Sequence, residues 1–289
     1  MGLIPSRTSI SDREFLLLKN YIAEHSGIII PPEKSYFIET RLSKFITDAG
    51  VDSFAEFYDH IVSDKDVLMR QNIINAITVN ETQWFRNEAP WKVLEQHLLP
   101  GFVDELARRK KKRVRIWCAA VSTGQEIYST VMCVDNYLKK NRVNGVTLSD
   151  FDFFATDISS QVLEIAKNGR YDKISIMRGL NNCYKEKYFT EKNSAWDIDK
   201  KIRDAVRFEC FNLQNSFHTF GLFDIIFCRY VLIYFSDALK RKTIAKMYGS
   251  LLDGGVLFTG NYALLDFFRD NFDENHFDNL TYYSKKGEL

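Results

Sequence analysis

The stretch AAVSTGQEIYS (residues 119–129) decides the fold of this chain. It continues the apolar, strand-forming run VRIWCAA (114–120) and opens into the amphipathic run EIYSTVMCVDNYLKK (126–140). A strand, a tight loop and a helix in this order are typical of the first βα unit of a nucleotide-binding sheet. Such a loop usually carries several glycines that cradle phosphates, whereas this loop has one, Gly124. The stretch therefore predicts a nucleotide-like ligand without a phosphate cradle.

The rest of the chain after residue 113 alternates short apolar runs with helical segments. This alternation predicts an α/β fold, a parallel sheet with helices on both faces. The segment 172–205 breaks the alternation and predicts a small insertion. The further expected strands are FDFFAT (151–156), VRFECF (206–211), FDIIFC (223–228) and VLFTG (256–260), with LTYYSK (280–285) as a candidate for one more.

Residues 1–75 predict helices throughout. Ser11, with Glu14 three positions later, has the pattern of a capping box, and Gly27 ends the first helix. The chain therefore predicts a small all-α domain before the α/β domain. Further helices are expected after Pro32, over 53–62, over 65–77 and from Pro90.

Composition excludes several classes of protein. The 289 residues are 45% hydrophobic and 27% charged, as in globular proteins, and no run approaches the roughly 18 apolar residues of a membrane span. The net charge of +1 gives no general attraction to nucleic acid, and the basic run RRKKKR (108–113) is expected to be a solvated connection. The five cysteines are widely spaced, which predicts reduced, buried thiols and a cytoplasmic protein. The five histidines are equally scattered, so no metal site is expected.

The positions of the polar residues indicate the kind of ligand. In a doubly wound sheet, ligands bind outside the carboxyl ends of the strands, where 121–126 and Asp157 are expected. An acid after the second strand accepts ribose hydroxyls, a helix N-terminus near Gly124 can face a carboxylate, and Glu126 can meet an ammonium group. S-adenosylmethionine has these groups and no phosphate, which favours a methyltransferase. Another nucleotide-binding sheet remains an alternative, because an Asp after a strand is also a common helix cap.

Further motifs make the prediction specific. The stretches NETQWFR (80–86), FNLQ (211–214) and FCRYVLIYF (227–235), with AAVSTGQEIYS and FATDIS (154–159), resemble the CheR-type chemotaxis receptor methyltransferases. They run in family order, and the helical N-terminus matches too, so the resemblance covers essentially the whole chain. It implies a helical domain over 1–75 and an S-adenosylmethionine-dependent methyltransferase domain over 76–289, with the insertion near 172–205.

The resemblance also implies roles for individual residues. Glu126 would hold the amino group of the cofactor and Asp157 the ribose. Arg86 and Tyr234 are the expected catalytic residues, Arg86 steering the acceptor carboxylate and Tyr234, with Arg229, at the rim where methyl transfer occurs. Each has a structural alternative, such as a helix cap at Asp157 or an ion pair at Arg86. The implied cofactor-binding residues are Asn80, Thr82, Arg86, Glu126, Asp157, Asn212, Leu213, Arg229 and Tyr230.

The implied reaction transfers the methyl group to glutamate side-chain carboxylates of chemotaxis receptors, giving methyl esters and S-adenosylhomocysteine. The partner would be the receptor's cytoplasmic helices, and Lys34, Arg41 and Lys44 are the candidates for binding them. An ordinary solvated helix face is the alternative for these three residues. We expect a monomer that neither inserts into the membrane nor binds nucleic acid, and a peptide tether is not expected because NSAWDIDKK (193–201) has no glycine.

The chain departs from the family pattern at three places. Tyr230 stands where an asparagine is expected against the cofactor, and a phenol cannot offer the donor and acceptor of an amide. Val121 and the segment GNYA (260–263) also differ. The alternative function is therefore a catalytically weakened protein that binds S-adenosylmethionine, or serves as a scaffold, in a signalling system.

Overall fold

The protein is described here by a computed structural model that covers residues 9–63, 67–260 and 268–287. Two compact units make up the chain, each with its own hydrophobic core. One takes in the chain up to Val79 together with Tyr234–Leu239, and the other comprises Asn80–Ile233 and Lys240–Leu289. Of the GNYA segment, residues 261–263 lie outside the described residues. None of the described helices has the length and apolar character needed to cross a membrane.

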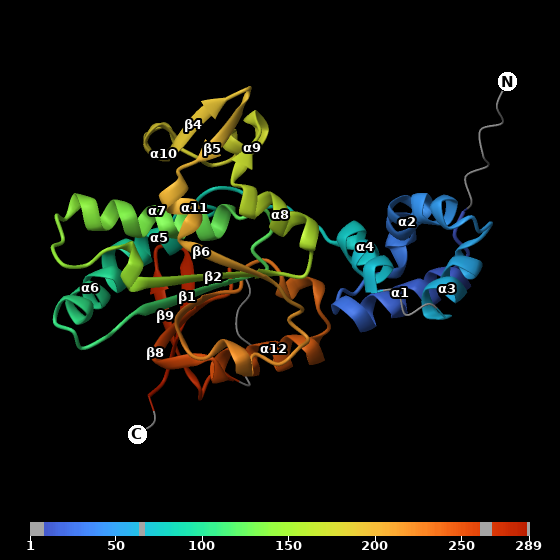
Figure 1. Ribbon diagram of the computed structural model, residues 1–289. Helices are drawn as coiled ribbons and strands as arrows, with labels where there is room; N and C mark the ends of the chain where they lie inside the picture. Colours follow the sequence, from blue (N-terminus) through green and yellow to red (C-terminus); the bar gives the residue numbers. More distant parts are fainter. Residues whose placement is uncertain (1–8, 64–66, 261–267, 288–289) are drawn as a thin grey trace. The chain divides into compact units, whose positions relative to one another are not determined.

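The first unit is all helical (Figure 1): α1 (Asp12–Ser26), α2 (Ser35–Ala49), α3 (Phe54–Ser63) and α4 (Val67–Ile77), with the 3-10 turn η1 (Pro32–Lys34) before α2. Helix α1 begins with the expected capping box, in which the Glu14 carboxylate accepts a hydrogen bond from the Ser11 amide at 2.9 Å. Gly27 ends α1 with φ 77°, a left-handed conformation that costs glycine little. The core of this unit includes Phe15, Leu18, Ile38, Leu42, Phe54, Phe57 and Ile73.

The second unit is built on a seven-stranded sheet of order β6-β2-β1-β7-β8-β10-β9. The five strands from β6 to β8 are parallel, whereas β10 is antiparallel to both neighbours, so the predicted α/β sheet is confirmed but is not parallel throughout. Strand β9 was not predicted, because four of its six residues are polar and it lies at the sheet edge with only one residue buried. The strands are β1 (Val114–Ala119), β2 (Phe151–Asp157), β6 (Val206–Cys210), β7 (Phe223–Phe227), β8 (Leu251–Phe258), β9 (Phe272–Phe277) and β10 (Leu280–Lys285).

Helices cover both faces of this sheet, and Figure 1 shows α7 (Gln125–Lys140) and α12 (Asp237–Gly249) on opposite sides. Helix α7 joins β1 to β2, and α8 (Ser160–Asn168) follows β2. Because β1 and β7 are covered on both sides, nearly all of their residues are buried. Other elements along the chain are α5 (Ala89–Val93), the π-helical turn η2 (Leu94–Leu98), α6 (Leu99–Ala107) and the short turns η3 (Leu148–Asp150), η4 (His218–Phe220) and η5 (Leu232–Tyr234).

Between α8 and β6 the chain forms a small sheet of its own, order β3-β5-β4, which stands apart from the large sheet in Figure 1. We call the chain from β3 to α11 the insertion. Its elements are β3 (Arg170–Tyr171), α9 (Lys173–Met177), α10 (Asn182–Tyr188), β4 (Phe189–Lys192), β5 (Ala195–Ile198) and α11 (Lys200–Asp204).

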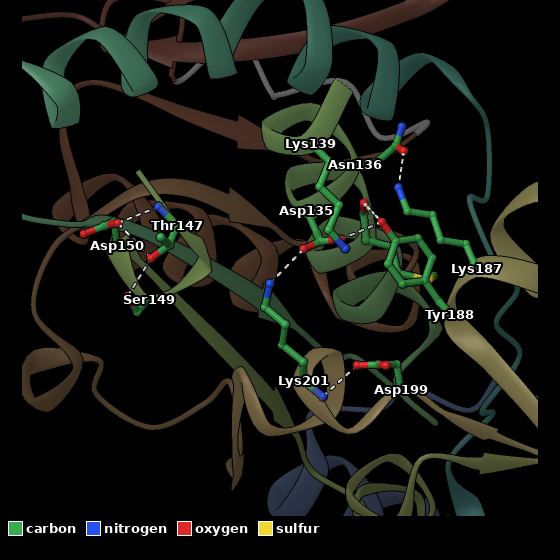
Figure 2. A network of polar contacts seen from close by, with 11 residues as sticks. Asp135, Asn136, Lys139, Thr147, Ser149, Asp150, Lys187, Tyr188, Asp199 and Lys201 are labelled. Atoms are coloured by element: carbon green, nitrogen blue, oxygen red, sulfur yellow. Dashed lines mark hydrogen bonds and ion pairs between the residues drawn. The ribbon is translucent and has the colours of Figure 1, made fainter. Parts of the chain in front are cut away.

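A polar network centred on Asp135 ties the insertion to α7 (Figure 2). The Asp135 side chain is 3% exposed, and it accepts hydrogen bonds from the Tyr188 hydroxyl at 2.8 Å and the Lys201 ammonium at 3.2 Å. Lys139, one turn along α7, pairs with the same carboxylate at 2.7 Å. Tyr188 ends α10 and Lys201 lies on α11. A buried carboxylate is tolerated only when it is paired, so these contacts fix the insertion against the helix.

The cysteine prediction was wrong for two of the five residues. Cys118, Cys133 and Cys228 are buried free thiols, but Cys183 and Cys210 are exposed. Cys210 ends β6, which lies at the edge of the large sheet, and Cys183 lies on α10 of the insertion. Neither place is covered on all sides by the main core. Apolar neighbours in the sequence do not reveal that a residue lies at such an edge.

Asp135→Asn tests the network. Burial favours the neutral acid, but the hydrogen bonds from Lys139, Tyr188 and Lys201 outweigh it and lower the pKa of Asp135. A depressed acid pKa stabilises the fold above the unfolded value of about 3.9, and this stabilisation is lost as the pH falls through the folded pKa. We expect Asp135→Asn to lower the free energy of unfolding by about 2 kcal/mol near neutral pH, and to lower it less in acid.

Urea unfolding followed across the acid range measures this, with Glu164→Gln as the control. Glu164 forms an exposed pair with Lys167 on α8, so its loss should change stability by less than about 0.5 kcal/mol. Equal unfolding midpoints for Asp135→Asn and the control at neutral pH would contradict the account.

Candidate active site

Polar side chains gather where the parallel strands β1, β2 and β7 end. From β1 the chain builds outward to β2 and β6, then returns to the other side of β1 to form β7. The direction in which successive strands are added to the sheet therefore reverses between β1 and β7. In doubly wound sheets this switch point, at the carboxyl ends of the strands, is where ligands bind.

The loop after β1 is held in an unusual conformation. Ala120 and Ser122 have φ of 60° and 53°, in the left-handed region that side chains with a Cβ rarely occupy. A methyl group on Gly124, φ 94°, would lie 3.0 to 3.2 Å from Ala166, Tyr128 and Tyr171, so a glycine is needed there. The Tyr171 hydroxyl donates to the carbonyl of Thr123 at 2.8 Å. The loop is thus fixed by its contacts and does not need a run of glycines.

Asp157 ends β2 and fixes this loop from the neighbouring strand. One carboxylate oxygen accepts from the Ser122 amide at 2.8 Å and the other from the Ser159 amide at 2.9 Å. Burial raises the pKa of Asp157 despite these bonds. The N-cap of α8 is Ser159, which accepts from Val162, so capping alone does not account for Asp157. The Ile158 amide also bonds this carboxylate, and three donors leave at least one of its roughly four lone-pair sites for a ligand hydroxyl.

Glu126 and Arg229 form a buried ion pair between the first turn of α7 and the chain after β7. The distance from the Arg229 Nη1 to Oε2 of Glu126 is 2.8 Å, and their side chains are 1% and 14% exposed. Burial raises the pKa of Glu126, although Arg229 opposes this. We expected Arg229 at the rim of the site, but the structure buries its guanidinium because it is tied to internal partners. Its hydrogen bonds reach two of the other predicted site residues, Glu126 and Arg86.

The segment 80–87 crosses the site without forming a helix or strand. The Ser122 hydroxyl donates to the Asn80 carbonyl at 2.9 Å, and the Arg229 Nη2 donates to the Arg86 carbonyl at 2.6 Å. Thr82 and Arg86 are half-buried in the same segment. The segment therefore brings Asn80 and Arg86 to the loop and the ion pair.

Tyr230, which stands where an asparagine was expected, has partners of its own in the structure. Its ring lies 3.7 Å from the Arg86 guanidinium, and its hydroxyl accepts from the Asn87 side chain at 2.5 Å. Its own φ is 61°, a strained value for a bulky side chain. A cation over an aromatic face is attracted by it, so Tyr230 orients Arg86, a role that an asparagine could not fill. No local sequence pattern predicts this contact.

Asn212 and Leu213 follow β6 in a loop held from two sides. The Phe211 amide donates to the Asp157 carbonyl at 2.8 Å, which joins this loop to β2. The Lys246 ammonium donates to the carbonyls of Leu213 and Asn215. Burial, with Lys242 nearby, lowers the pKa of Lys246 to about 8. Sequence reasoning missed Lys246, because it lies on α12, 31 residues from Asn215, with no local motif.

The other predicted residues belong to the helical unit. Tyr234 is grouped there, and its carbonyl accepts from the Ile29 amide at 2.8 Å. Its expected place beside the transferred methyl group stays a prediction. Lys34 ends η1, while Arg41 and Lys44 lie on α2, and all three are exposed. Arg41 lies 5.3 Å from the ring of Phe37.

The residues present fit the groups of S-adenosylmethionine. Helix α7 has Gly124 as its N-cap and no side-chain cap, so its first amides remain available to a carboxylate. Asp157 can accept from a ribose hydroxyl, and Glu126 can meet an ammonium group. Within the described ranges, no three histidine, cysteine or acidic side chains come together as a metal site would require.

Comparisons with known proteins agree with this geometry. The family description "CheR methyltransferase, SAM binding domain" matches residues 80–279, and "CheR methyltransferase, all-alpha domain" matches residues 13–78. The chain is 36% identical over 265 residues to "Chemotaxis protein methyltransferase 1" of Pseudomonas aeruginosa, covering 91% of this chain and 94% of that protein. It is 34% identical to "Chemotaxis protein methyltransferase Cher2" of Pseudomonas putida over the same shares of the two chains.

A third relative, "Chemotaxis protein methyltransferase 1" of Vibrio cholerae, is 35% identical and covers 92% of this chain and 94% of its own. Both family domains and nearly the full length of these relatives are therefore represented. The chain belongs to the CheR methyltransferase family and is an S-adenosylmethionine-dependent methyltransferase of chemotaxis.

Proposed function

We propose that this protein transfers the methyl group of S-adenosylmethionine to glutamate side-chain carboxylates of chemotaxis receptors. The products would be glutamate methyl esters and S-adenosylhomocysteine. The observation that carries the proposal is the setting of Arg86: the residue is half-buried, its guanidinium lies 3.7 Å from the Tyr230 ring, and it is close enough to Glu126 to oppose the rise that burial causes in the pKa of Glu126. A fixed cation beside the cofactor-binding edge suits an anionic acceptor.

The reaction asks little acid or base catalysis of the protein. Glutamate has a reference pKa of about 4.3, so the acceptor is already an anion at neutral pH, and the cofactor supplies an activated methyl group. The protein's task is to hold carboxylate and methyl group in line and to remove water from them. Arg86 would orient the acceptor. Its attraction to the Tyr230 ring keeps it from holding the carboxylate so firmly that transfer is opposed.

The cofactor would be held by the residues gathered at the switch point. Asp157 would accept the ribose hydroxyls, Glu126 would meet the ammonium group, and Asn212 with Leu213 would line the adenine. Asn80 and Thr82 would contact the cofactor from the segment 80–87. Tyr230 would bound it beside Arg86, and Arg229 would act by orienting Glu126, to which it is bonded at 2.8 Å.

Asp157→Ala tests the cofactor site. The variant removes the acceptor proposed for ribose, the bond from Ser122 that fixes the loop after β1 and the bond from Ser159 after β2, so we expect at least a tenfold loss of affinity for S-adenosylmethionine. Because the pKa of Asp157 is raised, wild-type affinity should also fall in mildly acidic solution as this carboxylate becomes protonated. Titration calorimetry measures both effects.

Asp150→Ala is the matched control, because Asp150 precedes β2 at the opposite end of the strand and caps η3. It should bind the cofactor as the wild type does. Equal affinities for the two variants would mean that the cofactor does not use Asp157.

The chemistry of the product distinguishes an enzyme from a scaffold. Incubation with a receptor cytoplasmic fragment and S-adenosylmethionine labelled in the methyl group should give label that alkali releases as methanol, because carboxylate esters hydrolyse whereas methylated amines do not. Replacing the acceptor glutamates with aspartates should abolish labelling. Cofactor binding without labelled receptor would favour the alternative, a catalytically weakened protein, and alkali-stable label would point to a different acceptor.

Receptor binding would use the basic stripe, which we define as Lys34, Arg41 and Lys44. These side chains are exposed, and Arg41 and Lys44 are three positions apart on α2, so they can meet an acidic helix face. The helical unit would thus recognise the receptor, while the second unit binds the cofactor. The charge and exposure of these residues, and the family to which the chain belongs, support this proposal.

Replacing all three residues of the basic stripe with alanine should raise the KM for receptor about tenfold at low salt and leave kcat unchanged. The difference should shrink as salt screens the charges. The control replaces Lys110, Lys112 and Arg113 with alanine, which removes the same charge from exposed positions elsewhere. Equal KM values for both triple variants would show that the stripe is an ordinary solvated face.

A further inference from the structure

The segment 80–87 has a second side, which contacts the insertion. The Trp84 amide donates to the Arg178 carbonyl at 2.9 Å, and the Trp84 indole donates to the Ser175 carbonyl at 3.0 Å. The Arg178 side chain pairs with the Glu81 carboxylate at 2.6 Å. Residues 175–178 belong to α9 and the turn that follows it. One turn of the insertion therefore bonds the segment at three points.

Packing at this contact leaves no spare room. Trp84 is 1% exposed, and its ring lies edge-on to the rings of Tyr171 and Phe189, with centroid distances of 5.0 and 5.2 Å. Tyr171 lies on β3 and Phe189 begins β4, so both belong to the small sheet. Gly179, φ 92°, lies against the backbone of Trp84, and a methyl group there would overlap the Trp84 carbonyl oxygen. A glycine is required because two backbones approach each other directly. A shift of the α9 turn must consequently move Trp84.

Arg86 lies two residues beyond this anchor, in a turn that its own sequence does not favour. Phe85 and Asn87, on either side of it, have φ of 46° and 56°. Such conformations persist only where surrounding contacts determine them. The Phe85 amide donates to the Ser129 hydroxyl at 3.0 Å, and Asn87 donates to Tyr230. The turn is thus held on one side by α7 and by Tyr230 in the chain after β7, and on the other by the insertion.

We propose that the insertion positions Arg86 through Trp84, so that the α9 turn contributes to methyl transfer by fixing the place of Arg86. Trp84 is a positioning residue, since it contacts the insertion and acts on the reaction by fixing the turn that presents Arg86. This inference rests on the role proposed for Arg86 above. It assigns to residues 175–179 a function in catalysis, separate from any binding that the insertion performs.

Gly179→Ala is the first test. It must displace either the α9 turn or the Trp84 backbone, so S-adenosylhomocysteine should bind at least tenfold more weakly, and kcat should fall about tenfold to a hundredfold. The matched control is Gly145→Ala. Gly145 also has a positive φ, 77°, but a methyl group there meets nothing within 4 Å. Both variants carry the backbone strain, and only Gly179→Ala disturbs the contact.

A second pair of variants applies if Gly179→Ala does not fold. Trp84→Phe keeps an aromatic ring but removes the indole hydrogen bond to Ser175, so kcat should fall at least threefold while the KM for receptor stays within twofold. The control is Trp196→Phe on β5 of the same insertion, where Lys185 lies over the ring. A change confined to kcat separates positioning from a general loss of folded protein.

The outcomes separate this inference from the proposed function. If the wild type and Gly145→Ala methylate receptor and Gly179→Ala or Trp84→Phe does so equally well, the insertion does not position Arg86. If the wild type transfers no methyl group, the proposed reaction fails. The inference is then judged by S-adenosylhomocysteine affinity alone, where equal values for Gly179→Ala and Gly145→Ala would overturn it.

Discussion

The arrangement of the candidate site in the second unit depends on one buried charge, the guanidinium of Arg229. A cation that is 1% exposed must have partners, because an unpaired buried charge costs several kcal/mol. Its partners are the Glu126 carboxylate and the Arg86 carbonyl, and it also lies 5.0 Å from the ring of Trp91. These groups come from α7, the segment 80–87 and α5. Satisfying one charge therefore brings together three parts of the chain at the carboxyl edge of the sheet.

The site is then built by backbone groups held in strained conformations. Ala120, Ser122, Phe85 and Tyr230 all have positive φ and all lie around this edge. Strain of this kind gathers where function requires one arrangement of the chain. Asp157 holds the loop after β1, and the insertion holds Trp84. Hydrogen bonds from these neighbouring parts of the chain therefore compensate for the backbone strain. The result is a preorganised edge in which few glycines are needed.

Sequence reasoning could place Asp157 and Glu126, because each follows a recognisable buried strand and strand ends meet at one edge of a parallel sheet. It could also place the capping box of α1, whose signal is local. It could not foresee that Arg229 is buried, since burial depends on partners 103 and 143 residues away. The same holds for Trp84 and Ser175, which are 91 residues apart. Strand β9 escaped notice because an exposed edge strand has no apolar pattern.

Amide hydrogen exchange with and without S-adenosylhomocysteine tests the central claim, that the cofactor lies where the ion pair, the loop after β1 and the segment 80–87 meet. The account predicts that ligand slows exchange in peptides covering 80–87, 120–127 and 211–215, which hold the Phe85 and Ser122 amides. Peptides at the amino ends of the strands, near 110–114 and 147–151, should not change. Protection confined to those amino ends, with none at 120–127, would contradict the account.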